Sequence, residues 1–382
     1  MSATVLIVSV IGLLSAYVCY GIQDGMVRRW RQWRHQQRLN LQVIRLSRQQ
    51  DMLKIWIADP HGRRLPKVVA GQHVLLCGQD LLGRSVSRAY SLVQDATHRH
   101  FYLLAIKAEP KGRLSQALFQ RLRVGDTLQL SYPKGQFKLQ GGWRHHPFVM
   151  TCLQPFGLAC VPLVLVGAGI GITPMLAMMM TALRQGRRVT LWYQARTEHD
   201  LLFHRYLQRL PNLDYRPILS RGQHGWQGAQ GRLTATTLLS VSGVNAEYYI
   251  CAKAEMVETL ERDLRLAGVQ HCYHELFSAA HSKDNFGIQF ADQQAQSFGH
   301  SSVLDALLAA GVQVPYDCRG GSCGQCRLKI VSGQCRTVLA AEYPLAAGEI
   351  LTCCVQASSP LELARPTEPS AHEQLPELIQ SQ

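Results

Sequence analysis

The chain has 382 residues, more than the ~150 of one ordinary domain, so two or three domains with separate cores are expected. Hydrophobic residues make up 47% of the chain and charged residues only 17%, which excludes a disordered polyelectrolyte. The formal net charge is +14, and seven arginines near the N-terminus supply half of it, so the charge gives little support to nucleic-acid binding. Six of the twelve cysteines fall between Cys318 and Cys354, which indicates a metal site in a reducing compartment.

The first segment of the chain is apolar. Residues 1–23 carry no charged side chain, and residues 5–22 approach the ~30 Å thickness of a bilayer core. Arginines follow this run instead of preceding it, which favours an anchor over a cleaved signal and places the rest of the chain in the cytoplasm. We therefore predict a single transmembrane helix at residues 1–23, a basic juxtamembrane segment at 24–40, and an inner-membrane location with soluble domains in the cytoplasm. An amphipathic helix lying on the membrane surface is the alternative.

Short alternating runs separated by Gly and Pro turns fill residues 41–142, and their spacing predicts an antiparallel β-barrel. One run contains an R-x-Y-S sequence, formed by Arg88, Tyr90 and Ser91, in which strand alternation places Arg88 and Tyr90 on one face. A glycine turn leads into a helix start soon afterwards, at Gly112, Arg113, Leu114 and Ser115. The free amides of such a helix N-terminus suit a pyrophosphate.

A second domain is predicted at residues 143–277. Its first strand, at 162–166, is continuously apolar, as in a sheet buried on both faces, and a glycine-rich loop and a helix at 175–183 follow. The loop has the pattern G-x-G-x-G-x-T-P, made by Gly167, Gly169, Gly171, Thr173 and Pro174, with Thr173 a candidate cap of the helix. Strands and helices continue to alternate after it, which predicts a parallel α/β sheet.

Together these motifs resemble the ferredoxin-NADP reductase superfamily. The resemblance implies that Arg88 pairs with flavin phosphate, that Tyr90 packs on the isoalloxazine ring and that Ser91 hydrogen-bonds near its reactive N5. It also implies that the segment from Gly112 to Ser115 holds the flavin pyrophosphate, which favours FAD over FMN, and that the glycine-rich loop binds NAD(P)H. Members that prefer NADPH hold its ribose phosphate at positions matching Arg196, Ser220 and Arg221, whereas a W-x-G turn at Trp226 also occurs in NADH-using members. The choice between NADPH and NADH therefore stays open.

The nicotinamide side of the predicted site departs from the family pattern. Members usually carry Cys-Gly-Pro after the fourth strand, and this chain has Cys251, Ala252 and Lys253. Loss of the glycine restricts φ, and Lys253 adds a charge. Cys251 is expected at the edge of the nicotinamide, with a buried strand-end cysteine as the alternative. Glu275 matches the end of the reductase module and is a candidate polar neighbour of the flavin.

A linker at residues 278–285 precedes a third predicted domain at 286–365, and a polar tail occupies 366–382. Cys318, Cys323 and Cys326 have the C-x4-C-x2-C spacing of plant-type ferredoxins, and Cys353 matches the fourth ligand through its L-T-C context. A helix at 302–310 and flanking strands predict a β-grasp fold. A structural zinc site is disfavoured because paired C-x2-C knuckles are absent. Cys354 and Cys335 have no assigned role.

The whole of residues 41–365 resembles a flavin reductase fused to a C-terminal 2Fe-2S ferredoxin, as in phthalate dioxygenase reductase-like proteins. The resemblance implies that a hydride passes from NAD(P)H to the flavin, whose electrons leave singly through the cluster to a protein acceptor. We predict a membrane-anchored reductase that serves a membrane oxygenase or desaturase, with a diiron enzyme as the expected partner. A membrane-tethered redox sensor with little coenzyme turnover is the alternative.

Overall fold

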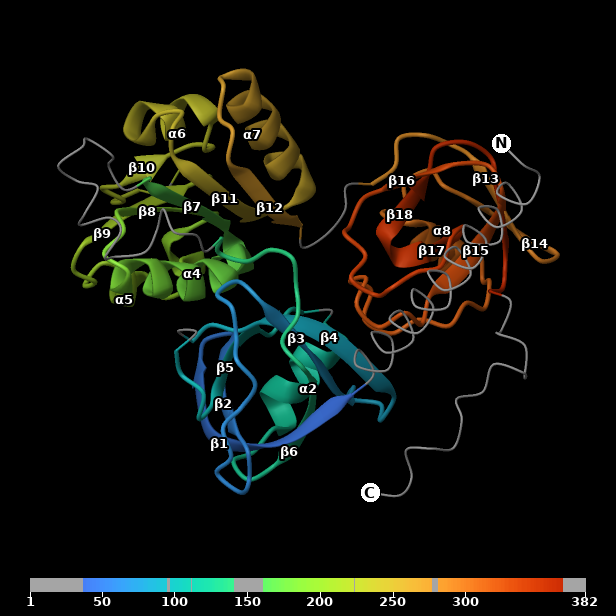
Figure 1. The fold of residues 1–382 in the computed structure, drawn as a ribbon, viewed down its shortest axis with the longest axis horizontal. Coiled ribbons are helices and arrows are strands. Elements are labelled where there is room, and N and C mark those ends of the chain that lie inside the picture. Colours follow the sequence, from blue (N-terminus) through green and yellow to red (C-terminus); the bar gives the residue numbers. More distant parts are fainter. Residues whose placement is uncertain are drawn as a thin grey trace, which may run out of the picture. The chain divides into compact units, whose positions relative to one another are not determined.

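The computed structural model describes residues 37–94, 97–110, 112–140, 161–222, 224–276 and 281–366. The chain divides into two compact units, one made of Met1–Ala280 with Asp317–Cys323 and the other of His281–Tyr316 with Gly324–Gln382. Figure 1 shows the first unit in blue to gold, with a barrel and an α/β domain, and most of the second unit in orange and red.

The barrel is a six-stranded antiparallel sheet with the strand order β4-β3-β6-β1-β2-β5. An antiparallel bridge between Leu92 and Leu104 joins its two ends, so the sheet closes. The amphipathic helix α2 packs Leu114 and Leu118 into the barrel core. The strands are β1 (Arg38–Gln49), β2 (Met52–Ala58), β3 (His73–Gln79), β4 (Ser85–Ser91), β5 (Tyr102–Lys107) and β6 (Thr127–Ser131), and α2 spans Arg113–Arg121. The predicted antiparallel barrel is confirmed, and β1 already begins at Arg38.

The α/β domain contains a six-stranded sheet with the order β10-β9-β8-β7-β11-β12, and all its pairings are parallel. From β7 the chain runs outward through β8, β9 and β10, and then returns to the other side of β7 at β11. This reversal creates a topological switch point between β7 and β11, where open α/β sheets bind their ligands. The elements are β7 (Leu163–Ala168), η3 (Gly169–Gly171), α4 (Ile172–Arg184), β8 (Val189–Ala195), η4 (Glu198–Asp200), α5 (His204–Leu207), β9 (Leu213–Leu219), β10 (Ala229–Gln230), α6 (Ala235–Ser242), β11 (Glu247–Ala252), α7 (Ala254–Leu266) and β12 (Cys272–Leu276).

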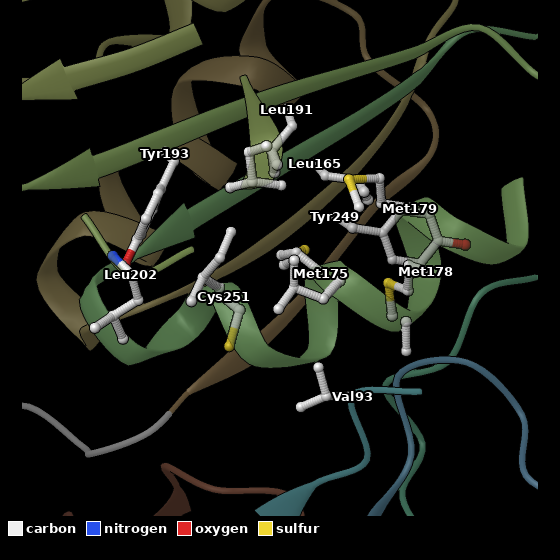
Figure 2. Packing of buried hydrophobic residues seen from close by; sticks show 14 of the residues in the cluster. Val93, Leu165, Met175, Met178, Met179, Leu191, Tyr193, Leu202, Tyr249 and Cys251 are labelled. Atoms are coloured by element: carbon white, nitrogen blue, oxygen red, sulfur yellow. The ribbon is translucent and has the colours of Figure 1, made fainter. Parts of the chain in front are cut away.

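Helix α4 connects the α/β domain to the barrel through a shared core. Met175, Met178 and Met179 are fully buried on α4, and Val93 and Phe137 of the barrel belong to the same hydrophobic cluster. Figure 2 shows Val93 on the barrel side of α4, while Leu165, Leu191 and Cys251 approach the helix from the sheet. Burial of these apolar side chains stabilises the arrangement of the two domains within the first unit.

The second unit has a five-stranded sheet with the order β14-β13-β19-β15-β17 and a two-stranded ribbon of β16 and β18. Helix α8 (Val303–Ala309) packs on the sheet, and the hydroxyl of Ser302 accepts a hydrogen bond from the Asp305 amide at its N-terminus. The strands are β13 (Gly287–Phe290), β14 (Gln293–Gln296), β15 (Arg327–Ser332), β16 (Cys335–Thr337), β17 (Glu349–Leu351), β18 (Val355–Ala357) and β19 (Leu361–Ala364), with η5 at Thr352–Cys354. Parallel pairing of β13 with β19 and the packed helix confirm the predicted ferredoxin-like β-grasp domain.

The membrane prediction is not supported. In the part of the chain that the structure describes, no helix is both long and apolar enough to cross a bilayer. The prediction of an inner-membrane location is therefore wrong. Residues 1–23, the predicted transmembrane helix, and residues 24–36 of the predicted juxtamembrane segment lie outside the described residues.

Candidate functional site

The glycine-rich loop lies at the switch point of the parallel sheet. Gly169 has a φ of 55°, in the left-handed region that favours glycine. A Cβ on Gly171 would lie 2.0 Å from the carbonyl oxygen of Cys251, so only glycine permits this close approach to β11. Helix α4 starts directly after the loop with no side-chain cap, and the Ile172 amide already donates to the carbonyl oxygens of Gly169 and Ile170.

Three other predicted residues lie in the first turn of α4 or just before it. Gly167 ends the apolar run of β7, and Pro174 occupies a first-turn position that needs no amide hydrogen. The Thr173 hydroxyl donates to the carbonyl oxygen of Ile170 at 3.0 Å. The prediction that Thr173 caps the helix is wrong, because the residue already lies inside the first turn and the N-cap position belongs to Gly171.

Parallel strand register brings Gly167, Cys251 and Glu275 into one row at the carboxyl edge of the sheet. Cys251 of β11 pairs with Gly167 of β7 on one side and with Glu275 of β12 on the other. The Cys251 thiol donates to Glu275 Oε2 across 3.9 Å. Burial, and secondarily the Glu275 carboxylate, raise the pKa of the Cys251 thiol well above its usual value. Cys251 is therefore a neutral hydrogen-bond donor in this row.

The departure from Cys-Gly-Pro causes no backbone strain. Ala252 is not among the described residues with positive φ, so it adopts a conformation open to any residue. Lys253 has a φ of −69°, close to the value that proline imposes, and its side chain is exposed. The change thus adds a surface charge at the start of α7 while the backbone keeps a form compatible with the family sequence.

His73 is a candidate site residue that sequence reasoning missed. It pairs with Ser91 across β3 and β4, and its Nδ1 atom lies 3.9 Å from Glu275 Oε1. The side chain is buried, so β3 brings an imidazole from the barrel to the Cys251 and Glu275 row. A lone histidine in an apolar strand gives no signal by itself. Its position opposite the R-x-Y-S strand could have been recognised only from the pairing of β3 with β4.

The R-x-Y-S residues lie on β4 as alternation predicts, with Arg88 and Tyr90 half-buried on one face and Ser91 buried on the other. Burial raises the pKa of the Tyr90 phenol, which therefore stays neutral. Arg88 Nη1 donates to the carbonyl oxygens of Ser87 at 2.7 Å and Asp317 at 2.9 Å, both within the first compact unit. Its hydrogen bonds thus go to backbone carbonyls, and its positive charge suits an anionic ligand such as a phosphate.

The start of α2 also suits a phosphate, which its backbone amides rather than a side chain would contact. Gly112 is the N-cap, and no side chain caps the helix. A Cβ on Gly112 would lie 2.1 Å from the Ser115 hydroxyl oxygen, so a larger residue there would require the Ser115 side chain to move. Leu114 and Ser115 are buried. Arg113 forms a salt bridge of 2.7 Å with the buried Asp80, so its charge is already paired within the barrel.

The three residues predicted to select the coenzyme lie together at the ends of β8 and β9. The Ser220 amide donates to the carbonyl oxygen of Ala195 at 2.8 Å, and the Arg221 amide donates to that of Arg196 at 3.2 Å. Both arginine side chains are exposed. Two exposed guanidinium groups on adjacent strand ends form a surface suited to a phosphate monoester.

The first pair of predicted cluster ligands, Cys318 and Cys323, lies in the loop Asp317–Cys323. The Gly320 amide donates to Cys318 Sγ at 3.4 Å. A hydrogen bond with the Cys323 thiol, assisted by amides of the loop, lowers the pKa of Cys318 to about 6. The loop thus stabilises a thiolate, which is the form that binds iron.

The second pair, Cys326 and Cys353, is formed by strand pairing. Cys326 directly precedes β15, Cys353 follows the end of β17, and these strands are antiparallel neighbours. The Thr352 amide and hydroxyl both donate to the Cys326 carbonyl oxygen, at 3.1 Å and 3.0 Å. A hydrogen bond with the Cys353 thiol, together with burial, raises the pKa of Cys326. A plant-type 2Fe-2S cluster takes four cysteine thiolates, two at each iron, and each unit supplies one pair of hydrogen-bonded thiols. No group of three or more potential ligands for a single metal ion occurs among the described residues.

A flavin-type barrel, a parallel sheet with a glycine loop at its switch point and a ferredoxin-like domain define an electron-transfer flavoprotein with an iron–sulfur centre. Family models match in the same order: an oxidoreductase FAD-binding domain at residues 43–139, an oxidoreductase NAD-binding domain at 165–262 and a 2Fe-2S iron-sulfur cluster binding domain at 290–358. The chain belongs to the family of phthalate dioxygenase reductase-like oxidoreductases, and its cofactors are FAD, NAD(P)H and a 2Fe-2S cluster.

Individual relatives cover most of the chain. The heme-dependent oxidative N-demethylase beta subunit of Ectopseudomonas mendocina (strain ymp) is 30% identical over 77% of this chain and 88% of that protein. The 3-chlorobenzoate-3,4-dioxygenase reductase subunit of Comamonas testosteroni is 29% identical over 83% of this chain and 94% of that protein. The solved structure of phthalate dioxygenase reductase has the same fold, with a TM-score of 0.57, 23% identity and coverage of 86% of this chain and 97% of that one.

The buried, neutral Cys251 thiol gives the first testable prediction. A raised pKa keeps the thiol protonated through about pH 8, where an ordinary cysteine already ionises. We therefore expect iodoacetamide at about pH 8 to leave Cys251 unmodified in the native protein and to alkylate it after denaturation. Peptide mass spectrometry measures both, with the half-buried Cys77 of β3 as the internal comparison. Alkylation of native Cys251 as fast as that of Cys77 would contradict the expectation.

Proposed function

We propose that this chain is the reductase component of an oxygenase system, which takes two electrons from NAD(P)H and delivers them singly to a protein acceptor. The observation that carries the proposal is the row of Gly167, Cys251 and Glu275 at the switch point, with His73 and Ser91 of the barrel beside it. Relatives named as reductase or beta subunits of demethylase and dioxygenase systems support the same role. An oxygenase or desaturase, with a diiron enzyme as one candidate, is the proposed acceptor.

The roles proposed for individual residues follow from their chemistry. Bound FAD supplies the conversion of a hydride into two single electrons. Arg88 and the α2 amides from Arg113 to Ser115 hold its phosphates, while Tyr90 and Ser91 position its ring. The glycine-rich loop binds the coenzyme pyrophosphate. Cys251 and Glu275 form a neutral thiol and carboxylate pair at the edge of the nicotinamide, and His73 orients the carboxylate.

The iron–sulfur ligands proposed are Cys318, Cys323, Cys326 and Cys353. This set is supported by the C-x4-C-x2-C spacing and by the pairing of thiols in two couples. Because a hydrogen bond with the Cys323 thiol, and secondarily the loop amides, lower the pKa of Cys318, deprotonation of this ligand is already favoured before metal is present.

An anaerobic reduction experiment tests the proposed function. The purified full chain is titrated with NADPH and, separately, with NADH while its absorption spectrum is recorded. We expect flavin and iron–sulfur bands to bleach with at least one coenzyme, followed by multiple turnovers with cytochrome c as acceptor. A loaded protein whose bands bleach with dithionite but with neither coenzyme would overturn the proposal and favour a redox sensor.

Coenzyme choice gives a second prediction. If Arg196 and Arg221 bind the 2′-phosphate, the double variant Arg196→Ala/Arg221→Ala raises KM for NADPH roughly 10- to 100-fold, since each charge-assisted hydrogen bond contributes ~1.5–3 kcal/mol and the two need not add fully. KM for NADH should stay within about twofold, because NADH lacks that phosphate. Arg216→Ala on β9 is the matched control, since its guanidinium pairs with Asp214 at 2.8 Å. Equal changes in KM for both coenzymes would contradict the assignment.

A further inference from the structure

Cys354 is a buried thiol next to a proposed cluster ligand. Its Sγ atom lies 3.7 Å from Cys353 Sγ, within the range of a sulfur hydrogen bond. Cys353 and Cys354 are 4% and 1% exposed, and both belong to the hydrophobic core of the second unit. The proposed chemistry assigns no role to Cys354.

Local backbone geometry explains why two consecutive side chains both face the interior. In a strand, neighbouring side chains point to opposite faces, but Thr352–Cys354 forms a tight 3₁₀ turn with about three residues per turn. The Cys354 carbonyl oxygen accepts hydrogen bonds from the Val338 amide at 2.8 Å and the Leu339 amide at 3.1 Å. Pairing of β16 with β18 begins at the next residue, so the turn is fixed on both sides.

The direction of the sulfur hydrogen bond follows from the chemistry of metal ligation. A cysteine that binds iron is a thiolate and has no proton to donate. When the cluster is bound, only the Cys354 S–H group can therefore donate in this pair, and the Cys353 sulfur accepts. The buried position of both atoms excludes bulk water as a competing donor.

A donor to a ligand sulfur changes the energy of the reduced cluster more than that of the oxidised one, because reduction adds negative charge to the iron and sulfur atoms. We propose that Cys354 is a positioning residue that donates an S–H···S hydrogen bond to Cys353 and raises the reduction potential of the 2Fe-2S cluster. This favours electron flow from the flavin to the cluster. The inference rests on the proposed ligand set.

The test compares full-length Cys354→Ala and Cys354→Val with the unmodified protein by EPR-monitored redox titration. Alanine removes the donor but leaves space for water, whereas valine removes it and fills the space. We expect the Cys354→Val potential to fall by about 30 mV, which is about a threefold change in the reduction equilibrium, since tenfold corresponds to 59 mV for one electron. Cys335→Ala, which removes a half-buried thiol of the same domain, should leave the potential unchanged.

Two further readouts separate the proposal from a packing effect and from an error in the ligand set. Exchange into D2O should shift the iron–thiolate stretching bands of the unmodified protein more than those of Cys354→Val, because the S–H proton is missing in the variant. An unchanged potential and equal deuterium shifts in Cys354→Val would overturn the proposal. Loss of the cluster in Cys354→Ala with its retention in Cys353→Ala would also overturn the proposal, because Cys354 would then be the ligand. Retention of the cluster in Cys354→Ala with its loss in Cys353→Ala supports the proposal.

Discussion

Replacement of Cys326 by alanine is expected to abolish electron delivery to a one-electron protein acceptor while the flavin half of the molecule keeps working. Cys326 supplies one of two proposed thiolates at one iron, and alanine offers no replacement ligand. We expect cytochrome c reduction to fall roughly 100-fold or more, because single electrons leave through the cluster. Ferricyanide reduction, which draws on the flavin directly, should stay within about twofold.

The control for this variant is Cys335→Ala, which removes a thiol of β16 outside the proposed ligand set. It should retain both activities and the iron content of the unmodified protein. FAD content, measured for both variants, checks that the first unit is intact. Full cytochrome c reduction by a Cys326→Ala protein that lacks iron would disprove the proposed electron path.

The candidate cluster ligands and the glycine-rich loop could be proposed from sequence because each depends on a short, contiguous spacing. C-x4-C-x2-C lies within nine residues, and a strand, a glycine turn and a helix follow one another directly in the loop. Cys353 is distant in sequence, and its place beside Cys326 depends on the antiparallel pairing of β15 with β17. The L-T-C context made it the predicted fourth ligand without that geometry.

Interactions between distant segments could not be predicted. His73 approaches Glu275 only because the barrel and the α/β sheet share a core, and no local pattern encodes that contact. Arg113 stands in a predicted phosphate-binding segment, yet Asp80 of a remote hairpin pairs with it. The membrane prediction rested on the hydropathy of residues 1–23 and on the arginines that follow them, which indicate what a segment is able to do in a bilayer and not where the protein resides.

The close approach of Gly171 to Cys251 leads to the other large expected effect. In Gly171→Ala the new Cβ would lie 2.0 Å from the Cys251 carbonyl oxygen. This oxygen belongs to the backbone of β11, which cannot move away as easily as the end of a flexible side chain. The loop and the end of β11 must therefore separate, which misplaces the coenzyme pyrophosphate relative to the nicotinamide edge. We expect kcat/KM for the preferred coenzyme to fall by about 100-fold, because misplacement of the reacting groups by about 1 Å has effects of this size.

The position of the defect in the electron path distinguishes this effect from general unfolding. Dithionite reduces flavin and cluster without the coenzyme, so both bands of Gly171→Ala should still bleach with dithionite while bleaching with NAD(P)H slows. Gly287→Ala is the control, because Gly287 has an ordinary φ and a Cβ there meets nothing within 4 Å. If Gly171→Ala kept the kcat/KM of the unmodified protein, the expectation would be wrong, because the loop would tolerate a shift away from β11. The row of Gly167, Cys251 and Glu275 would then not need its observed register to accept a hydride donor.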